Sequence, residues 1–366
     1  MKVLSLFDGM ACGALALQAA GIEIESYDAF EIDKYAIQTS THNFPFIRQH
    51  GDVFEADFTK FEGVDLVCGG SPCTYWSIAQ KNNRETEASG MGWELFSQYV
   101  RAIKEAKPRF FVYENNKSMS NAIRESITST FGFEPIMINS ALVSAQNRQR
   151  LYWVGERQED GTYKKVAVEQ PMDRGILLRD ILESGVVDKE KAYCLKHQAG
   201  NARDYFKKHH TQIAFEPRAK TGLYATPLRV PEATKQGYVD IEVGDCVDLT
   251  FPNSKTRLGR LMKEKSNCLT TASNELYQYL GTIDKPVYEV KDGFITIKGK
   301  QYPIKLKDGY YIIRKLTVKE CMRLQTVPEW FVFPVSDTQA YKMLGNGWTV
   351  EVIAHILNYI KENENV

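Results

Sequence analysis

One cysteine of this 366-residue chain lies where the sequence favours reaction over packing. The apolar run VDLVCGG (64–70) reads as a buried strand that contains Cys68, and the chain then turns through Ser71 and Pro72 to Cys73. A cysteine inside a strand packs as a small apolar side chain. Cys73 instead follows two glycines and a proline, where the backbone turns outward, and the thiolate of a presented cysteine is a nucleophile. The sequence therefore predicts a thiol that meets a substrate.

Ionisable side chains accompany two further predicted strands. Glu114 ends the apolar strand RFFVYEN (109–115), whereas Arg148 and Arg150 alternate in QNRQR (146–150) and so face one side of a strand. Taken singly, Glu114 is equally well an ordinary surface acid, and the arginines are equally well a solvated basic edge. The pairing with Cys73 favours a catalytic interpretation of Glu114.

The segment LFDGMACG (6–13) predicts a ligand site of another kind, because it follows a strand and opens a helix. Its glycines let a ligand approach the backbone closely, but it lacks the G-x-G-x-x-G spacing of dinucleotide sites. Glu31 ends the next strand, where a carboxylate can accept hydrogen bonds from ribose hydroxyls. The segment GDV (51–53) follows the third strand, beside the expected adenine edge. In this order, the three segments favour an adenosyl ligand without a pyrophosphate.

The elements that must position these side chains alternate between strands and helices over the first 155 residues. Apolar strands separated by amphipathic helices predict an α/β fold with a parallel sheet that is covered on both faces. From about 160 to 311 the helical periodicity weakens, and short β-like runs predict a smaller β-rich domain. Helical periodicity returns at 316–328 and 349–362, so we expect one domain of 1–160 with 312–366 and a second of 161–311.

Composition excludes several classes. No apolar run is long enough to span a bilayer, and Asp8 interrupts the apolar start of the chain, which argues against a secretory signal. The seven cysteines are scattered, without paired zinc-ligand spacing, so we expect free thiols, no metal and a cytoplasmic protein. The formal net charge is zero and no heptad pattern is present, which favours a monomer.

Five segments in sequence order resemble the C5-cytosine DNA methyltransferases: FDGMACGALAL, GGSPCTYWS, YENNKSM, QNRQRLYW and LGNGWTVEVI. The FDGMACG form and the tryptophan of GNGWTV are most similar to the catalytic domain of the animal de novo enzymes. The resemblance implies a Rossmann-like, S-adenosylmethionine-dependent methyltransferase sheet with a β-rich target-recognition domain. The implied reaction is methyl transfer from S-adenosylmethionine to C5 of a flipped-out cytosine in a specific DNA sequence, through a covalent adduct between Cys73 and C6.

The resemblance also implies roles for individual residues. Glu114 would bond cytosine N3 and the exocyclic amine, Arg150 the carbonyl oxygen, and Arg148 a phosphate or the loop after Cys73. Phe7 would pack on adenine, Asp8 would lie near the methionine amino group, and Glu31 would hold the ribose. The full set implied for the cofactor is Phe7, Asp8, Gly9, Met10, Cys12, Glu31, Ile32, Asp52, Val53, Ser71, Pro72, Leu95, Asn346 and Trp348. The chain departs from the family at Asn116, where valine is usual, and at Gly347, where many members have serine.

Contacts with nucleic acid are expected in the middle domain and after the nucleophile. Residues 194–235 hold eight Lys or Arg against three Asp or Glu, and residues 255–265 hold five against one. Such charge supplies phosphate contacts, although a charge run is more often a solvated face. The candidate DNA contacts are Ser77, Lys81, Arg84, Lys255, Arg257, Thr270 and Thr271.

Three alternatives stay open at this point. The catalytic motifs do not identify the polymer, so RNA cytosine is an alternative substrate. A catalytically silent DNA-binding homologue is another, although both Cys73 and Glu114 are present. The absence of G-x-G-x-x-G counts against a nicotinamide-dependent dehydrogenase. The sequence leaves the target site and a restriction-modification, orphan or phage role undecided.

Overall fold

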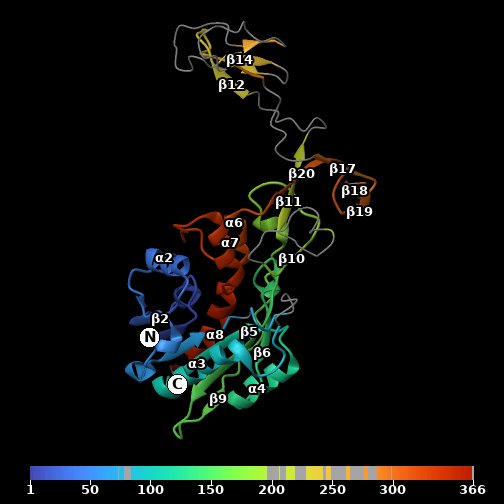
Figure 1. Ribbon diagram of the computed structural model, residues 1–366. Coiled ribbons are helices and arrows are strands. Elements are labelled where there is room, and N and C mark those ends of the chain that lie inside the picture. Colours follow the sequence, from blue (N-terminus) through green and yellow to red (C-terminus); the bar gives the residue numbers. More distant parts are fainter. Residues whose placement is uncertain are drawn as a thin grey trace. The chain divides into compact units, whose positions relative to one another are not determined.

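The computed structural model describes residues 1–72, 74–77, 84–195, 206, 212–218, 228–241, 245–248, 261–263, 276–278, 287–297 and 299–364 (Figure 1). Six of the expected site residues lie outside this described part: Cys73, Lys81, Lys255, Arg257, Thr270 and Thr271. The chain forms two compact units. The larger holds residues 1–183, 189–213 and 315–366, and the smaller holds 184–188 and 214–314.

An eight-stranded sheet forms the centre of the larger unit. Its strands are β1 (Lys2–Leu6), β2 (Ser26–Phe30), β3 (Arg48–Gln49), β4 (Leu66–Gly69), β5 (Phe110–Asn116), β6 (Ile136–Asn139), β8 (Gln149–Arg157) and β9 (Tyr163–Lys165). The order is β3-β2-β1-β4-β5-β8-β6, with β9 paired to β8. The neighbours from β3 to β5 are parallel, and β5 carries an unbroken run of buried residues, which is typical of a strand covered on both faces.

The sheet is mixed, whereas the alternating pattern predicts a wholly parallel one. Strand β8 runs antiparallel to β5, β6 and β9. The segment between β6 and β8 is short and contains only the 3-10 turn η3 (Ser140–Leu142) and the strand β7 (Gln146–Asn147). A connection this short cannot carry the crossover that parallel neighbours need. The α/β class itself is confirmed.

Seven helices of the described part accompany the sheet: α1 (Cys12–Ala19), α2 (Lys34–Asn43), α3 (Gly90–Ala106), α4 (Asn121–Phe131), α6 (Val318–Leu324), α7 (Asp337–Asn346) and α8 (Val350–Glu364). Helix α8 buries an apolar stripe that includes Val352, Ile356 and Ile360, and it packs against α1. The C-terminal segment 315–366 thus belongs to the larger unit. Three further 3-10 turns are η1 (Val53–Glu55), η2 (Phe58–Phe61) and η4 (Leu178–Ile181).

Aromatic side chains fill the core between the sheet and the helices α3 and α4. Tyr99 and Tyr113 are fully buried, with ring centroids 4.8 Å apart. The Tyr99 hydroxyl donates to the carbonyl oxygens of Val67 and Val112, on β4 and β5, at 3.1 and 2.8 Å. A buried hydroxyl that is satisfied in this way fixes α3 against the strands that lead to the site.

The larger unit extends beyond residue 160, where the loss of helical periodicity predicts a boundary. Strand β10 (Ala192–Tyr193) pairs in parallel with β7, and Leu195 N donates to Gln146 Oε1 at 2.7 Å. Residues near 190 therefore belong to the body that carries the sheet. Such long-range pairing leaves no periodic signal in the sequence.

The smaller unit is β-rich, as expected. Its largest sheet has the order β11-β20-β17-β18-β19, formed by β11 (Ile213–Arg218), β17 (Val287–Lys291), β18 (Phe294–Ile297), β19 (Lys300–Pro303) and β20 (Gly309–Lys315). The remaining described strands are β12 (Leu228–Pro231), β13 (Tyr238–Ile241), β14 (Cys246–Asp248), β15 (Leu261–Met262) and β16 (Leu276–Gln278).

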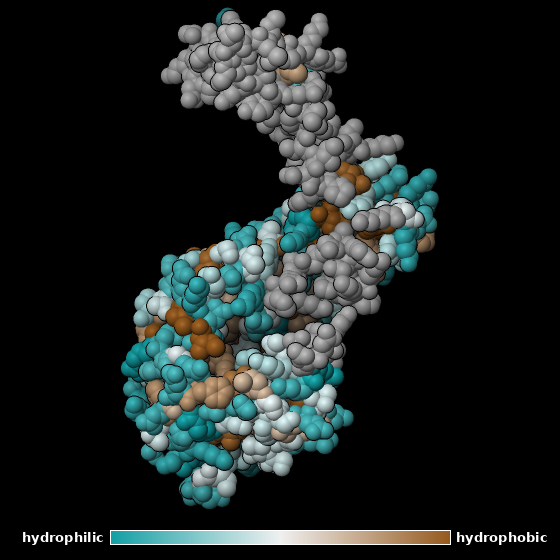
Figure 2. Space-filling model, viewed as in Figure 1, coloured by the Kyte–Doolittle hydropathy of each residue, from teal (hydrophilic) through white to brown (hydrophobic). Residues whose placement is uncertain are grey.

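The visible surface of the described part is mainly hydrophilic, with apolar patches on the larger unit (Figure 2). Exposed large apolar side chains include Ile32, Phe46 and Trp330. Among the described residues, no helix is both long and apolar enough to cross a membrane.

Candidate active site

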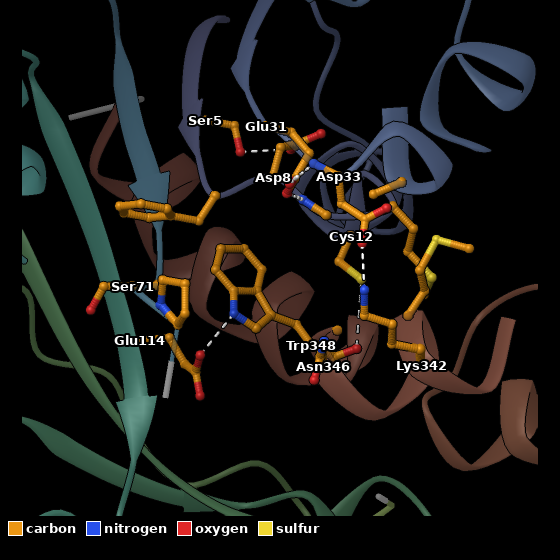
Figure 3. Close-up of a pocket in the computed structure, with 18 of the residues that line it drawn as sticks. Ser5, Asp8, Cys12, Glu31, Asp33, Ser71, Glu114, Lys342, Asn346 and Trp348 are labelled. Atoms are coloured by element: carbon orange, nitrogen blue, oxygen red, sulfur yellow. Dashed lines mark hydrogen bonds and ion pairs between the residues drawn. The ribbon is translucent and has the colours of Figure 1, made fainter. Parts of the chain in front are cut away.

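A pocket of about 260 Å³ lies in the larger unit, at the carboxyl ends of β1, β2, β4 and β5 (Figure 3). The start of α2, the arginines Arg148 and Arg150, the end of α7 and the turn after it supply the rest of the lining. Thirteen of the expected residues line it: Phe7, Asp8, Gly9, Met10, Cys12, Glu31, Ser71, Pro72, Glu114, Arg148, Arg150, Asn346 and Trp348. The structure thus brings segments from both ends of the chain to one place.

The turn after β1 has an unusual backbone. Phe7, Gly9 and Ala11 have φ angles of 57°, 60° and 66°, in the left-handed region that favours glycine. Two of the three are not glycine, so the surrounding structure must hold them there, as is common where backbone strain serves a ligand site. The sequence predicted the turn but not this conformation.

Asp8 places a carboxylate with one free acceptor in the pocket wall. Its Oδ1 atom accepts hydrogen bonds from Ser5 Oγ at 2.6 Å and Tyr27 OH at 2.7 Å, whereas Oδ2 is buried without a partner. Burial raises the pKa of Asp8 to about 6, although both hydrogen bonds lower it. A buried acceptor of this kind needs a donor, and a cationic ligand would satisfy it.

Glu31 is held rigidly by backbone groups. Its Oε1 atom accepts from the amides of Ile32 and Asp33, and Oε2 accepts from the amide of Gly9, each at 2.8 Å. Oε1 thus accepts two hydrogen bonds and Oε2 only one, so Oε2 retains capacity for a further hydrogen bond. The side chain is therefore oriented before any ligand binds.

Four of the expected cofactor residues do not line this pocket. Ile32 is 72% exposed, and Asp52 caps η1 by accepting from Phe54 N at 3.0 Å. Val53 belongs to the apolar core, and Leu95 packs against that core. Their contact with the cofactor stays a prediction.

Glu114 and Arg150 form an ion pair in the opposite wall of the pocket. Arg150 Nε lies 3.0 Å from Glu114 Oε1, and Trp348 Nε1 donates to Glu114 Oε2 at 2.9 Å (Figure 3). The antiparallel register of β5 and β8 pairs Asn116 with Arg150, which brings the guanidinium group near Glu114. Both carboxylate oxygens are therefore engaged by side chains.

Arg148 is almost fully buried and donates to main-chain carbonyl groups. Its Nη1 and Nη2 atoms lie 3.1 Å from Gly345 O and 2.7 Å from Gly347 O. The guanidinium group thereby fixes the turn that carries Trp348. Arg148 and Arg150 both line the pocket, as the alternation in QNRQR predicts.

Asn116 departs from the family pattern without leaving its polar groups unsatisfied. Its backbone N–H and its Nδ2 donate to Asn115 Oδ1 at 2.8 and 3.1 Å, and its Oδ1 accepts from Ser118 Oγ at 2.6 Å. An amide therefore fits at this buried position.

Close contacts with neighbouring strands explain the two glycines that precede Cys73 in the sequence. A Cβ atom on Gly69 would lie 2.3 Å from Leu6 O, and one on Gly70 would lie 2.6 Å from Glu114 O. Glycine is required at both because the end of β4 passes so close to β1 and β5. Pro72 and Thr74, on either side of Cys73 in the sequence, both line the pocket.

The start of the following segment is anchored in the core. Trp76 is fully buried, and its Nε1 atom donates to Glu85 Oε2 at 3.2 Å. Arg84 donates to the carbonyl oxygens of Trp76 and Ser118, at 3.2 and 2.7 Å. The structure therefore uses the Arg84 guanidinium group within the protein, and a DNA contact by Arg84 or by the partly buried Ser77 stays a prediction.

Sequence reasoning missed a group of pocket residues: Ser5, Asp33, Ala36, Gly70, Thr74, Lys342, Met343 and Gly347. Asp33 caps α2 and pairs with Lys342 across the pocket, at 2.6 Å. The cap is readable from the sequence, because Asp33 directly precedes a helix. Lys342 left no signal, because its partner is 309 residues away.

The profile of the C-5 cytosine-specific DNA methylases matches residues 1–362. The chain belongs to this family. Its curated relatives include the type II methyltransferase M1.ScrFI of Lactococcus lactis subsp. cremoris, 27% identical over 99% of this chain and 78% of that protein. The orphan methyltransferase M.Rho11sI of Bacillus phage rho11s is 34% identical, over 43% of this chain and 33% of the phage protein. The match to the phage protein thus spans about a third of that protein's length.

Solved structures show the same fold in other members. The S. pombe Dnmt2 methyltransferase matches all of this chain with a TM-score of 0.54 and 13% identity. A putative prophage DNA modification methyltransferase from E. coli matches with a TM-score of 0.52 and 18% identity over the full length of both chains. The Rossmann-like α/β fold is confirmed. The curated relatives come from bacteria and their viruses, and they do not support the closer likeness to animal de novo enzymes.

Proposed function

We propose that this family member transfers a methyl group from S-adenosylmethionine to C5 of a cytosine that is flipped out of DNA. One observation carries the proposal. A single pocket joins the unpartnered Asp8 acceptor and the fixed Glu31 carboxylate with the Glu114–Arg150 pair.

The pocket fits S-adenosylmethionine, which would supply an electrophilic methyl group. Glu31 would accept hydrogen bonds from the ribose hydroxyls. Asp8 Oδ2, which has no hydrogen-bond partner within the described part of the chain, would accept a hydrogen bond from the ammonium group of the cofactor. Phe7 would pack on the adenine. Such a ligand has no pyrophosphate, which agrees with a turn that lacks the G-x-G-x-x-G spacing.

The opposite wall would hold the cytosine. Glu114 would bond N3 and the exocyclic amine, while Arg150 would bond the carbonyl oxygen. A base in a duplex cannot reach either group, so the target nucleotide must leave the stack. Both side chains would then stabilise charge that develops on the ring during reaction.

Cys73 would act as the nucleophile. Its thiolate would form a bond to C6, and the displaced electron pair would make C5 able to attack the methyl group. Loss of the C5 proton and departure of the thiolate would then restore the aromatic ring. The net products are the methylated base, the demethylated cofactor and a proton, and the Cys73 thiolate is regenerated.

DNA recognition is assigned to the β-rich segment 161–311. Its basic runs would contact phosphates, with Lys255, Arg257, Thr270 and Thr271 as candidates, and Ser77, Lys81 and Arg84 would act nearer the nucleophile. The names of the relatives favour a type II restriction-modification or orphan enzyme. We expect the protein to act as a monomer.

The test is a methylation assay on a mixed-sequence duplex and, in parallel, on a structured RNA pool, both read by bisulfite sequencing. Protected cytosines in DNA are expected, and their context gives the target site. Cys73→Ser should abolish protection while calorimetry shows unchanged cofactor affinity, and the buried Cys321→Ser serves as matched control. If cytosines were protected only in the RNA pool, the substrate would be RNA and not DNA. Cofactor binding without any protection would indicate a silent homologue.

A further inference from the structure

A second cysteine lies beside the two active-site arginines. Cys194 Sγ is 3.3 Å from Arg148 Nη1 and 3.6 Å from Arg150 Nη2. Both guanidinium groups line the pocket, whereas Cys194 lies behind them and does not. No motif draws attention to this residue, because 44 and 46 positions separate it from the arginines.

The backbone on both sides of Cys194 fixes its position. Strand β10 ends at Tyr193 and pairs with β7, which directly precedes Arg148. On the other side, Leu195 is buried and its amide donates to Gln146 Oε1 at 2.7 Å. The thiol is therefore held against the arginines by a paired strand and a buried anchor.

The surroundings of Arg148 provide a physical reason for its contact with Cys194. Its side chain is almost fully buried, and apart from Cys194 its partners are the carbonyl oxygens of Gly345 and Gly347. Within the described part of the chain, no carboxylate lies within ion-pair distance of Arg148. A buried cation without a counter-charge is costly. The nearby charge of Arg150 adds repulsion, which an anion in contact with both guanidinium groups would relieve.

The pKa of the Cys194 thiol agrees with a role as a counter-charge. Burial raises the pKa of Cys194, but the two guanidinium groups lower it by more, so the pKa lies below that of an ordinary cysteine. Burial raises the pKa of Cys12 and of Cys68 to about 12, which keeps both of those thiols neutral. The charged groups that face Cys194 are the two arginines, and Glu114 lies on the other side of Arg150.

We infer that Cys194, as a thiolate, is the counter-charge that positions Arg148 and Arg150 for the methyl-transfer reaction. It is a positioning residue and takes no part in bond formation. Through Arg148 it supports the turn that carries Trp348, and through Arg150 it supports Glu114. The inference rests on the proposed function, because its effect is read on the methylation rate.

The test compares Cys194→Ala, Cys194→Ser and Cys194→Asp in the full chain, with Cys321→Ala as a matched control. Cys321 is also buried, but burial and the neighbouring Glu320 raise the pKa of its thiol. We expect the alanine variant to lose roughly tenfold or more in single-turnover methylation rate, the loss typical of a charge-assisted contact. Serine should restore part of the rate and aspartate most of it, with cofactor affinity unchanged by calorimetry.

Several outcomes would overturn the inference. Equal rates for wild type and the alanine variant would remove the role of Cys194 altogether. Equal losses for alanine, serine and aspartate would show that shape, not charge, matters at this position.

A second measurement does not need activity. The absorbance at 240 nm of wild type minus that of Cys194→Ser should contain a thiolate signal at pH 7, and its absence would overturn the inference. A wild-type protein that methylates neither DNA nor RNA would remove the proposed function, while the absorbance difference would still decide the charge of Cys194.

Discussion

The two walls of the pocket are prepared in different ways. In the wall built from the β1 turn and the end of β2, Glu31 is held by three backbone amides and Asp8 keeps a free oxygen. In the wall built from β5 and β8, both oxygens of Glu114 are already bound by Arg150 and Trp348. The first wall is ready to receive a ligand, whereas the second must exchange a partner. A ligand at the first wall should therefore form new contacts without breaking existing ones, whereas a ligand at the second wall should replace a bond that Glu114 already makes.

The largest expected effect comes from removing the charge of the second wall. Glu114→Gln keeps the shape of the side chain but weakens its pairing with Arg150 and its hold on a cytosine. We expect a loss of about 10²–10³ in single-turnover rate, the range for groups that stabilise developing charge. Cofactor affinity should stay unchanged, with the exposed Glu125→Gln on α4 as control. A variant with normal rate would exclude Glu114 from the chemistry.

The next effect concerns affinity and belongs to the first wall. Glu31→Ala removes the acceptor for the ribose hydroxyls and should weaken cofactor binding roughly 10- to 100-fold, as expected for hydrogen bonds to a charged group. DNA affinity should not change. Calorimetry measures the first quantity, and the exposed Glu25→Ala is the control. Unaltered cofactor affinity would take Glu31 out of the ribose site.

Asp8 makes the stability of the first wall depend on pH. Its pKa is about 6 in the folded protein against 3.8 for the free side chain, so the ionised form destabilises the fold above pH 6, and this cost disappears as the pH falls toward 4. At about 1.4 kcal/mol per pKa unit, Asp8→Asn should raise the free energy of unfolding at pH 7 by up to about 3 kcal/mol.

The same substitution should weaken cofactor binding about tenfold, because the ammonium group loses its counter-charge. Wild-type affinity should also fall as the pH drops below about 6. Denaturant unfolding and calorimetry between pH 5 and pH 8 measure both quantities, with the exposed Asp160→Asn as control. A variant that is less stable and binds the cofactor normally would contradict this role for Asp8.

The smallest expected effect is on DNA affinity, and it tests whether cytosine replaces Trp348 as a hydrogen-bond partner of Glu114. Trp348→Phe keeps an aromatic ring but removes the donor to Glu114 Oε2. If cytosine must displace this bond, DNA binding should tighten by roughly 1 kcal/mol, about the net value of one hydrogen bond. Fluorescence anisotropy with a target duplex measures the change, and the exposed Trp330→Phe is the control. Weaker binding would show that the indole assists the base.

The features that could be predicted from the sequence depend on residues that are close to one another along the chain. Asp8 and Glu31 lie at strand ends, so the alternation of strands and helices places them at one edge of the sheet. The antiparallel β8 was not predicted, because the alternation of strands and helices before it indicates a parallel sheet; the short connection after β6 is the sign of the change in direction. Cys194 and Lys342 could not be found either, because their partners lie far away in the sequence. Val53 belongs to the same core cluster as Phe30 and Phe58, and its predicted contact with the cofactor stays a prediction.

The packing of α8 on α1 has a consequence for the chain during its synthesis. Helix α1 has buried residues all around it, yet α8 begins more than three hundred residues later. At the usual rate of about 5–20 residues per second, the ribosome needs roughly 20 s to one minute to make the intervening chain. For that time the face of α1 that α8 covers is an exposed apolar surface, to which a holding chaperone could bind. The cofactor pocket cannot be completed until the turn at Asn346–Trp348 has emerged.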